Sequence, residues 1–457
     1  MRFLLLILIS FFIIGSNAQQ NFSLEAAIKY ALDHNLTLAV QKLDVLDANS
    51  QIQEYTSIGL PKINGSVGYS HFIKIPTNIF PDFISPSIYD VLFKEELLPD
   101  RDIDFGSGFP VQFGTKNILN AGVELNTLLF DGSFFVGLKA QRLYRELIFK
   151  QYSQSEADIR YKVTKAYLST LIVKENIRNL DKNISNLDRV YIELNEIYKA
   201  GFIEKLDLDR MDLSLQNLKT EREKLNRVSA LTTNLLKFQM SYPIADSIVT
   251  TQSLDEILNT SYLEIMDPSI KLDLTVRPEY AVIEQSKKLA EINIRRYKAS
   301  YFPSLVGFAS YQTSLQRNDL FDSKENKWFP TSVVGLNLNV PIFDGFDRKA
   351  KIGRAKVLLD KTNLQLNLFE QGVQLEFENS KTQYRNTLIT LDARKKSLAL
   401  AERIYQVSKT KFKEGLGSSI EITTAERDLY DAQANVLDAQ YEIILAKIEL
   451  DKALGKL

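Results

Sequence analysis

The sequence is poor in the side chains from which catalytic and metal sites are built. It contains no cysteine, which excludes disulfides, thiolate metal sites and cysteine nucleophiles, and its only histidines are His34 and His71. Gly415-Leu416-Gly417 is not a phosphate loop, because no strand precedes it and no Lys-Ser/Thr pair follows. The Asp and Glu residues are dispersed at the spacing of exposed helix faces. We therefore expect no enzyme, no cofactor and no metal site.

The N-terminus has the pattern of a secretory signal. Arg2 precedes a mostly apolar run over residues 3–14, and Ser16-Asn17-Ala18 supplies a small-x-small cleavage site. The run is shorter than the roughly 20 residues of a spanning helix, so we interpret residues 1–18 as a signal peptide. No later segment predicts a transmembrane helix, so a mature chain that crosses a membrane must do so as β-strands. The net charge of −1 gives no basis for a nucleic-acid partner.

Two long windows, residues 111–242 and 342–457, contain none of the 12 prolines. Because proline costs about 3 kcal/mol inside a helix, such windows favour very long helices. Apolar residues alternate in steps of three and four from Ile422 to Ala453 and again from Leu180 to Tyr198. This spacing predicts coiled-coil packing. A continuous helix over residues 134–199 would be roughly 100 Å long at 1.5 Å per residue.

The two windows belong to an internal duplication. Phe130-Asp131-Gly132 matches Phe343-Asp344-Gly345, and Gly201 matches Gly415, at offsets of 213 and 214. We predict one subunit with two repeats, residues 19–240 and 277–457, joined by an inter-repeat segment over 241–276. The predicted elements are, in repeat 1, strands 63–72 and 118–130 and a helical hairpin over 134–240 with its tip near 201, and in repeat 2, strands 304–313 and 332–343 and a hairpin over 347–455 with its tip near 415.

The predicted strands alternate apolar and polar residues, as in Ile63-Asn64-Gly65-Ser66-Val67. Such alternation fits the wall of a membrane barrel and also a soluble sheet with one wet face. The signal peptide and the two strands in each half favour the membrane. Four strands cannot close a barrel, and open edges in lipid leave backbone groups unpaired. Two subunits would give eight strands and three would give twelve; because an eight-stranded barrel is filled by side chains, we favour a trimer.

A long loop, residues 73–117, separates the first two strands and is rich in proline and aromatic residues. Outer-membrane barrels keep their long loops outside the cell. We interpret this loop as an extracellular cap or plug, and both an ordered lid and a mobile loop fit the sequence.

Taken together, the paired Phe-Asp-Gly turns, the aromatic-x-x-Gly motif before each tip, and Ala453-Leu454-Gly455 near the C-terminus resemble the TolC-like outer-membrane efflux proteins. The resemblance covers residues 22–457. It implies a mixed membrane α+β fold: a homotrimer whose 12-stranded transmembrane β-barrel, with four strands per subunit, continues into a long periplasmic α-helical coiled-coil barrel. It further implies a passive channel of the Gram-negative outer membrane for multidrug efflux or type I secretion. The inter-repeat segment would form part of a belt around the helical barrel. The implied partners are a periplasmic adaptor, an inner-membrane pump and outer-membrane lipid.

The resemblance also implies a gate at the hairpin tips, closed by polar ties and carboxylate rings. Counted from the tip glycines, Glu421 falls at the position of a constricting aspartate, and Thr424 falls where a second aspartate is often found. Asp207 matches a carboxylate used in closing ties, but Phe412 stands where its tyrosine partner is usual. Three carboxylates around an axis would select cations in a narrow pore. For docking onto the adaptor, the implied tip residues are Gly201, Leu206, Gly415 and Ile420.

A cell-surface coiled-coil protein with a structural or adhesive role is the alternative. It would explain the heptads and the signal, but not the duplicated strand pairs or the glycine turns that fold each long helix back. The cargo cannot be read from the sequence.

Overall fold

The computed structural model describes residues 20–99, 101–104, 106, 108–258, 271–319 and 327–456. The predicted signal peptide and residues 259–270 of the inter-repeat segment lie outside this set. The chain forms two compact units. The helical unit contains Met1–Ser50, Arg142–Glu291 and Ala355–Leu457, and the sheet unit contains Gln51–Gln141 and Ile292–Arg354. Each repeat therefore contributes to both units, and the division between the units runs across the repeats.

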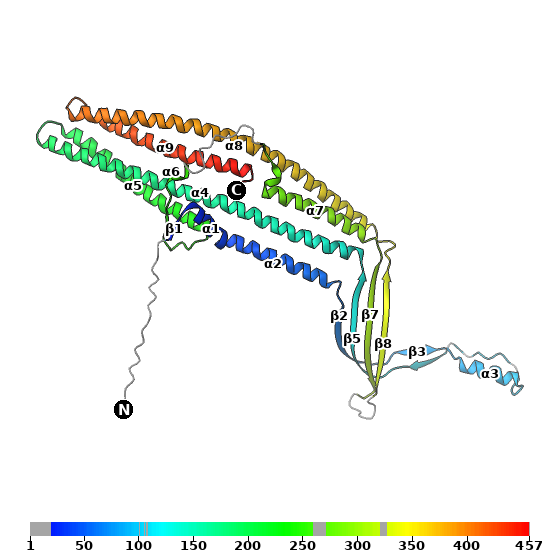
Figure 1. The fold of residues 1–457 in the computed structure, drawn as a ribbon. Coiled ribbons are helices and arrows are strands. Elements are labelled where there is room, and N and C mark those ends of the chain that lie inside the picture. The colour runs from blue at the N-terminus through cyan, green and yellow to red at the C-terminus, as the bar shows by residue number, and fades with distance from the viewer. Residues whose placement is uncertain are drawn as a thin grey trace, which may run out of the picture. The chain divides into compact units, whose positions relative to one another are not determined.

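Two hairpins of long helices dominate the chain (Figure 1). The first joins α4 (Gly132–Lys199) to α5 (Lys205–Met240), and the second joins α8 (Asp347–Lys413) to α9 (Ser419–Ala453). The continuous helix that the sequence predicts over 134–199 is present within α4, which has 68 residues. Among the described helices, none carries an apolar stretch that could cross a bilayer.

The heptad positions of the sequence form the contacts between these helices. Of the ten seam residues that the sequence predicts between Ile422 and Ala453, nine are buried, and the tenth, Ala432, is partly buried and packs against the core. Toward the tips, all four long helices contribute to one apolar cluster. It contains Leu187, Val190, Leu194, Leu208, Met211, Leu215, Ala401, Tyr405, Ile422, Ala425 and Leu429. The hairpins are thus held to each other by burial of apolar side chains, as their spacing predicts.

A second, larger core lies where the shorter helices α1 (Leu24–His34) and α2 (Leu36–Ser57) join the long ones. Here β1 (Gln20–Phe22) pairs in parallel with β6 (Ile248–Thr250) of the inter-repeat segment. The buried Tyr167 of α4 donates a hydrogen bond of 3.0 Å to the Phe22 carbonyl. The inter-repeat segment also contains α6 (Leu254–Ile257) and the short 3-10 helix η2 (Leu274–Val276), and α7 (Pro278–Ala299) follows it.

The sheet unit holds four antiparallel strands in the order β2-β5-β7-β8. They are β2 (Lys62–His71), β5 (Asn117–Phe130), β7 (Ser304–Arg317) and β8 (Trp328–Asn339). The last strand differs from the predicted range of 332–343, because it begins and ends four residues earlier. Pro341 has no N–H to donate, which ends the strand. Pro330 is tolerated because β8 is an edge strand.

The segment predicted as a loop over 73–117 has secondary structure of its own. Within it, β3 (Thr77–Phe80) pairs with β4 (Phe109–Gln112), and α3 (Ile84–Lys94) lies between them. The Asp82 carboxylate accepts hydrogen bonds from the backbone N–H groups of Ile84 and Ser85, at 3.2 and 2.8 Å, and so caps α3. Pro86 is compatible with this helix because it lies in the first turn.

Both Phe-Asp-Gly motifs start a long helix. The Asp131 carboxylate accepts from the backbone N–H of Phe134 at 3.0 Å, and the Asp344 carboxylate accepts from Phe346 and Arg348 at 3.1 and 3.0 Å. The glycines serve different purposes. Gly345 has φ +62°, which favours glycine, whereas a Cβ on Gly132 would meet the Ala299 carbonyl at 3.0 Å. The duplicated motif therefore performs one task, helix capping, with two backbone geometries.

We predict that Asp344→Ala lowers the free energy of unfolding by about 1 kcal/mol, because two N–H groups at the start of α8 lose their acceptor. The measurement is loss of helical circular dichroism on denaturation in detergent. Asp347→Ala is the matched control, since Asp347 lies in the first turn but only forms an exposed 2.6 Å pair with Lys351. Such a pair contributes about 0.5 kcal/mol or less. Equal losses in the two variants would contradict the capping role.

Candidate gate at the hairpin tips

The two hairpins turn with the same backbone geometry. At the first tip, Gly201 has φ +82° and the N–H of Phe202 donates to the Ile197 carbonyl at 3.1 Å. At the second tip, Gly415 has φ +73° and the N–H of Leu416 donates to the Lys411 carbonyl at 2.9 Å. Both are Schellman caps, in which glycine takes the left-handed position. The sequence prediction that these glycines end helices is confirmed.

Each tip presents apolar side chains to solvent. Leu206 and Ile420, which the sequence implies for docking, are each 52 % exposed. Phe202 and Leu416, the residues after the tip glycines, are more exposed still, at 82 % and 81 %. Sequence reasoning missed these two, although the 214-residue offset that relates the glycines relates them as well. The tips therefore carry four exposed apolar side chains at equivalent positions of the two repeats.

A polar tie joins the first hairpin to the second beside the tips. The Ser419 hydroxyl of α9 donates a hydrogen bond to the Asp207 carboxylate of α5. Arg210 lies next to both, with its Nη1 3.9 Å from the carboxylate and 3.5 Å from the Ser419 hydroxyl oxygen. Asp207 thus has a hydroxyl partner although Phe412 lacks a phenol. A second link is the ion pair of 2.7 Å between Lys413 of α8 and Glu193 of α4.

The other predicted gate residues do not join this tie. Phe412 is half-buried and packs against the apolar cluster near the tips. Glu421 is exposed in the first turn of α9, and its backbone N–H donates to the capping Ser418 hydroxyl at 3.3 Å. Thr424 is also exposed and lines a cavity of about 400 Å³ between α5 and α9, together with Arg210 and Glu426. Glu421 therefore meets no partner from its own subunit among the described residues.

A buried carboxylate lies just beyond the predicted gate. Glu426 is only 5 % exposed, and its Oε2 has no hydrogen-bond partner among the described residues. Burial raises the pKa of Glu426 to about 8, although the charge of Lys409 acts in the opposite direction. The hydroxyl of Tyr405 in α8 is likewise buried without a partner, and burial and the nearby Glu426 raise its pKa to about 12. Sequence reasoning missed Glu426, which directly follows the seam residue Ala425.

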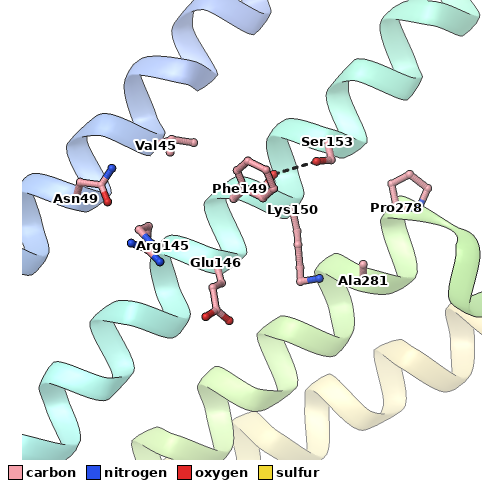
Figure 2. A pocket seen from close by; sticks show the side chains of 9 residues that line it. All are labelled: Val45, Asn49, Arg145, Glu146, Phe149, Lys150, Ser153, Pro278 and Ala281. Atoms are coloured by element: carbon pink, nitrogen blue, oxygen red, sulfur yellow. Dashed lines mark hydrogen bonds between the residues drawn. The ribbon is translucent and has the colours of Figure 1, made fainter.

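A larger cavity, of about 670 Å³, lies within the helical unit among α2, α4 and α7 (Figure 2). Its walls carry the charged residues Arg145, Glu146 and Lys150 beside the apolar side chains of Val45, Phe149, Pro278 and Ala281. The only hydroxyl in it, on Ser153, donates to the Phe149 carbonyl at 3.4 Å and has no basic partner. No group of three His, Asp or Glu residues in the described chain could hold a metal. This cavity therefore offers no nucleophile–base pair.

Known proteins resemble this chain in sequence and in fold. Residues 270–456 match the model of the family described as outer membrane efflux protein. TolC of Vibrio cholerae is 20 % identical over 360 residues, which is 75 % of this chain and 78 % of TolC. The cation efflux system protein CusC of Escherichia coli O157:H7 is 22 % identical over 437 residues, 94 % of this chain and 85 % of CusC. The open-state structure of the Neisseria gonorrhoeae channel MtrE covers 94 % of this chain and 88 % of MtrE, with a TM-score of 0.71 at 17 % identity.

The chain is therefore similar to outer-membrane efflux proteins in sequence and in fold. The likeness to this solved channel confirms the subunit fold that the sequence resemblance implies. Within the described residues, this fold brings Asp207 together with Ser419 and Arg210, and places Thr424 next to Arg210 and Glu426 in one cavity. It leaves Glu421 on the surface.

The buried Glu426 predicts a pH-dependent stability. Because its pKa in the folded chain lies above the value of about 4.3 expected in the unfolded chain, the folded state holds a proton that the unfolded state has lost between these two values. The free energy of unfolding should therefore fall as pH rises from 5 to 8.

We predict that Glu426→Gln flattens this part of the stability profile, measured by denaturation at pH 5, 6, 7 and 8. The control is Glu421→Gln, which changes an exposed residue about one and a half turns away in α9 and should keep the slope of the unsubstituted chain. A Glu426→Gln profile as steep as that of the control would show that Glu426 does not carry the dependence.

Proposed function

We propose that the chain is one subunit of a passive trimeric export duct, gated at the hairpin tips and docked there onto a periplasmic adaptor and an inner-membrane pump. One observation carries the proposal. A sheet of four strands with two open edges continues directly into helical hairpins of roughly 100 Å. An export duct needs a wall that crosses the membrane and a long tunnel below that wall. The sheet suits the wall, and the helical hairpins suit the tunnel.

The open edges require other subunits. Strands β2 and β8 each pair on one side only, and unpaired backbone groups within lipid cost several kcal/mol each. The apolar residues Val334, Leu336 and Leu338 on β8 are 60 % or more exposed and alternate with polar Asn337 and Asn339. This alternation suits a wall with lipid outside and water inside. Twelve strands from three copies would close such a wall and leave a conducting lumen.

The tips support the docking and gating parts of the proposal. Exposed apolar side chains at Phe202, Leu206, Leu416 and Ile420 suit a helical partner with an apolar groove. We propose that the tie between Asp207 and Ser419 holds the two hairpins of a subunit together in the closed state. We further propose that the exposed Glu421 faces its copies across the axis, where three carboxylates would attract cations.

We propose that transport through the duct is passive. Among the described residues, no group of three His, Asp or Glu residues could hold a metal, and the cavity of about 670 Å³ pairs its one hydroxyl with no base. Energy and cargo selection would then come from the pump. The relatives include a cation efflux protein and a protein of protease secretion, which fits a duct whose cargo is chosen by the pump.

The trimer predicts a defined cross-linking pattern. The chain has no native cysteine, so Ser66→Cys in β2 and Thr331→Cys in β8 can be joined only through the introduced thiols. A short bismaleimide should link the double variant in native membranes into a ladder that ends at three chains, because β2 of one copy would adjoin β8 of the next. Each single variant is the control. A ladder that ends at two chains would refute the twelve-strand barrel.

The gate predicts altered conduction. Glu421→Gln should raise the resting conductance in a planar bilayer, or weaken block by multivalent cations, because it removes the proposed carboxylate ring. Glu414→Gln provides a matched control, since Glu414 is also exposed at the second tip but is not placed at the constriction. Unchanged current–voltage curves and unchanged cation block in Glu421→Gln would remove this residue from the constriction.

A further inference from the structure

The end of the sheet that adjoins the helices is built from four chain segments, which we call the junction: residues 51–62, 129–141, 292–305 and 341–354. Strand pairing brings these segments to one end. Lys62 pairs with Asn126, Phe130 with Leu305, and Ser304 with Asn339. The opposite end carries the β3–α3–β4 segment, which lies between β2 and β5 in the chain (Figure 1).

The junction is basic although the chain as a whole carries a net charge of −1. Its four segments contain nine Lys and Arg residues against four Asp and Glu residues. The segment at the opposite end has the reverse balance, with four basic and seven acidic residues over 73–116. The sheet therefore separates a basic end from an acidic end.

Most of the basic side chains at the junction are not neutralised by carboxylates. Arg348 pairs with Asp344 and Lys351 pairs with Asp347. Six others are exposed and have no carboxylate within 4.0 Å among the described residues; they are Lys62, Lys139, Arg295, Lys298, Lys349 and Arg354. Unpaired cations gathered around one end of a sheet attract an anionic partner.

Exposed aromatic rings accompany these cations. Phe302, Phe343 and Phe346 are 63–76 % exposed, and Phe130, Phe135 and Tyr301 are about half exposed. The Lys349 ammonium lies 5.9 Å from the Phe346 ring centre, and the Arg348 guanidinium lies 5.5 Å from that of Tyr301. A partner that covers both groups must offer apolar surface and negative charge side by side.

We propose that the junction binds anionic phospholipids of the inner leaflet, with their phosphate groups on the unpaired Lys and Arg side chains and their acyl chains against the aromatic rings. The inference rests on the proposed function, which lets the sheet cross the outer membrane with the junction on its periplasmic side. Aromatic side chains favour the headgroup level of a bilayer, and ammonium and guanidinium groups bind phosphate through charge-assisted hydrogen bonds. A soluble polyanion would satisfy the cations but would leave the rings in water.

The test measures which lipids stay bound. The assembled protein is extracted from vesicles of equal phosphatidylglycerol and phosphatidylcholine, and the retained headgroups are counted by mass spectrometry. The unsubstituted protein should retain phosphatidylglycerol in several-fold excess. A variant with Lys298, Lys349 and Arg354 changed to Gln should lose most of that excess, and the control with Lys395, Lys411 and Arg394 changed to Gln should keep it. The control residues are exposed on α8 outside the sheet unit.

Equal loss in the two variants, or no preference in the unsubstituted protein, would overturn the lipid site. A preference for added lipopolysaccharide over phosphatidylglycerol would also overturn it, because the anion would then belong to the other leaflet. Channel conductance of the same preparations separates this outcome from the proposed function. A junction variant that conducts without lipid preference refutes only the lipid site, whereas absence of conductance in the unsubstituted protein refutes the duct.

Discussion

The pairing of backbone N–H and C=O groups is the constraint on which the rest of this structure depends. Inside the sheet, β5 and β7 satisfy it on both sides, but β2 and β8 satisfy it on one side only. Water can hydrate such edges and lipid cannot. A single subunit in a membrane would therefore leave the backbone groups at these edges unpaired. It needs neighbouring subunits whose strands can pair with them. The large exposed apolar residues of β2 and β8 fit that requirement.

The helical hairpins satisfy their backbone groups internally, so a different constraint shapes them. Their stability comes from apolar burial along seams such as Ile422 to Ala453, and each end needs a cap. Asp131 and Asp344 cap the starts of α4 and α8, and Gly201 and Gly415 allow the turns at their ends. Because α4 and α8 are capped at both ends and packed along a seam, each can run without a break from the sheet unit into the helical unit.

The parts of the fold that depend on local sequence patterns could be predicted from the sequence. Heptads, proline-free windows and duplicated turns report local geometry, and they placed the long helices and the tip glycines. The partners of individual polar side chains were not predictable. The tie between Ser419 and Asp207 depends on how α5 packs against α9, and the burial of Glu426 depends on which face of α9 the seam selects. The β3–α3–β4 elements were missed because the segment has no counterpart in the second repeat.

Divergence between the repeats gives the carboxylates at the two tips different partners. Asp207 and Glu421 occupy equivalent positions, yet one is tied within the subunit and the other is free among the described residues. Ser419, which binds Asp207, is equivalent to Lys205. If the repeats were identical, lysine would stand at both positions or serine at both, and the two carboxylates would have the same partner. Unequal tips instead allow one carboxylate to hold the hairpins together while the other stays available for the proposed gate.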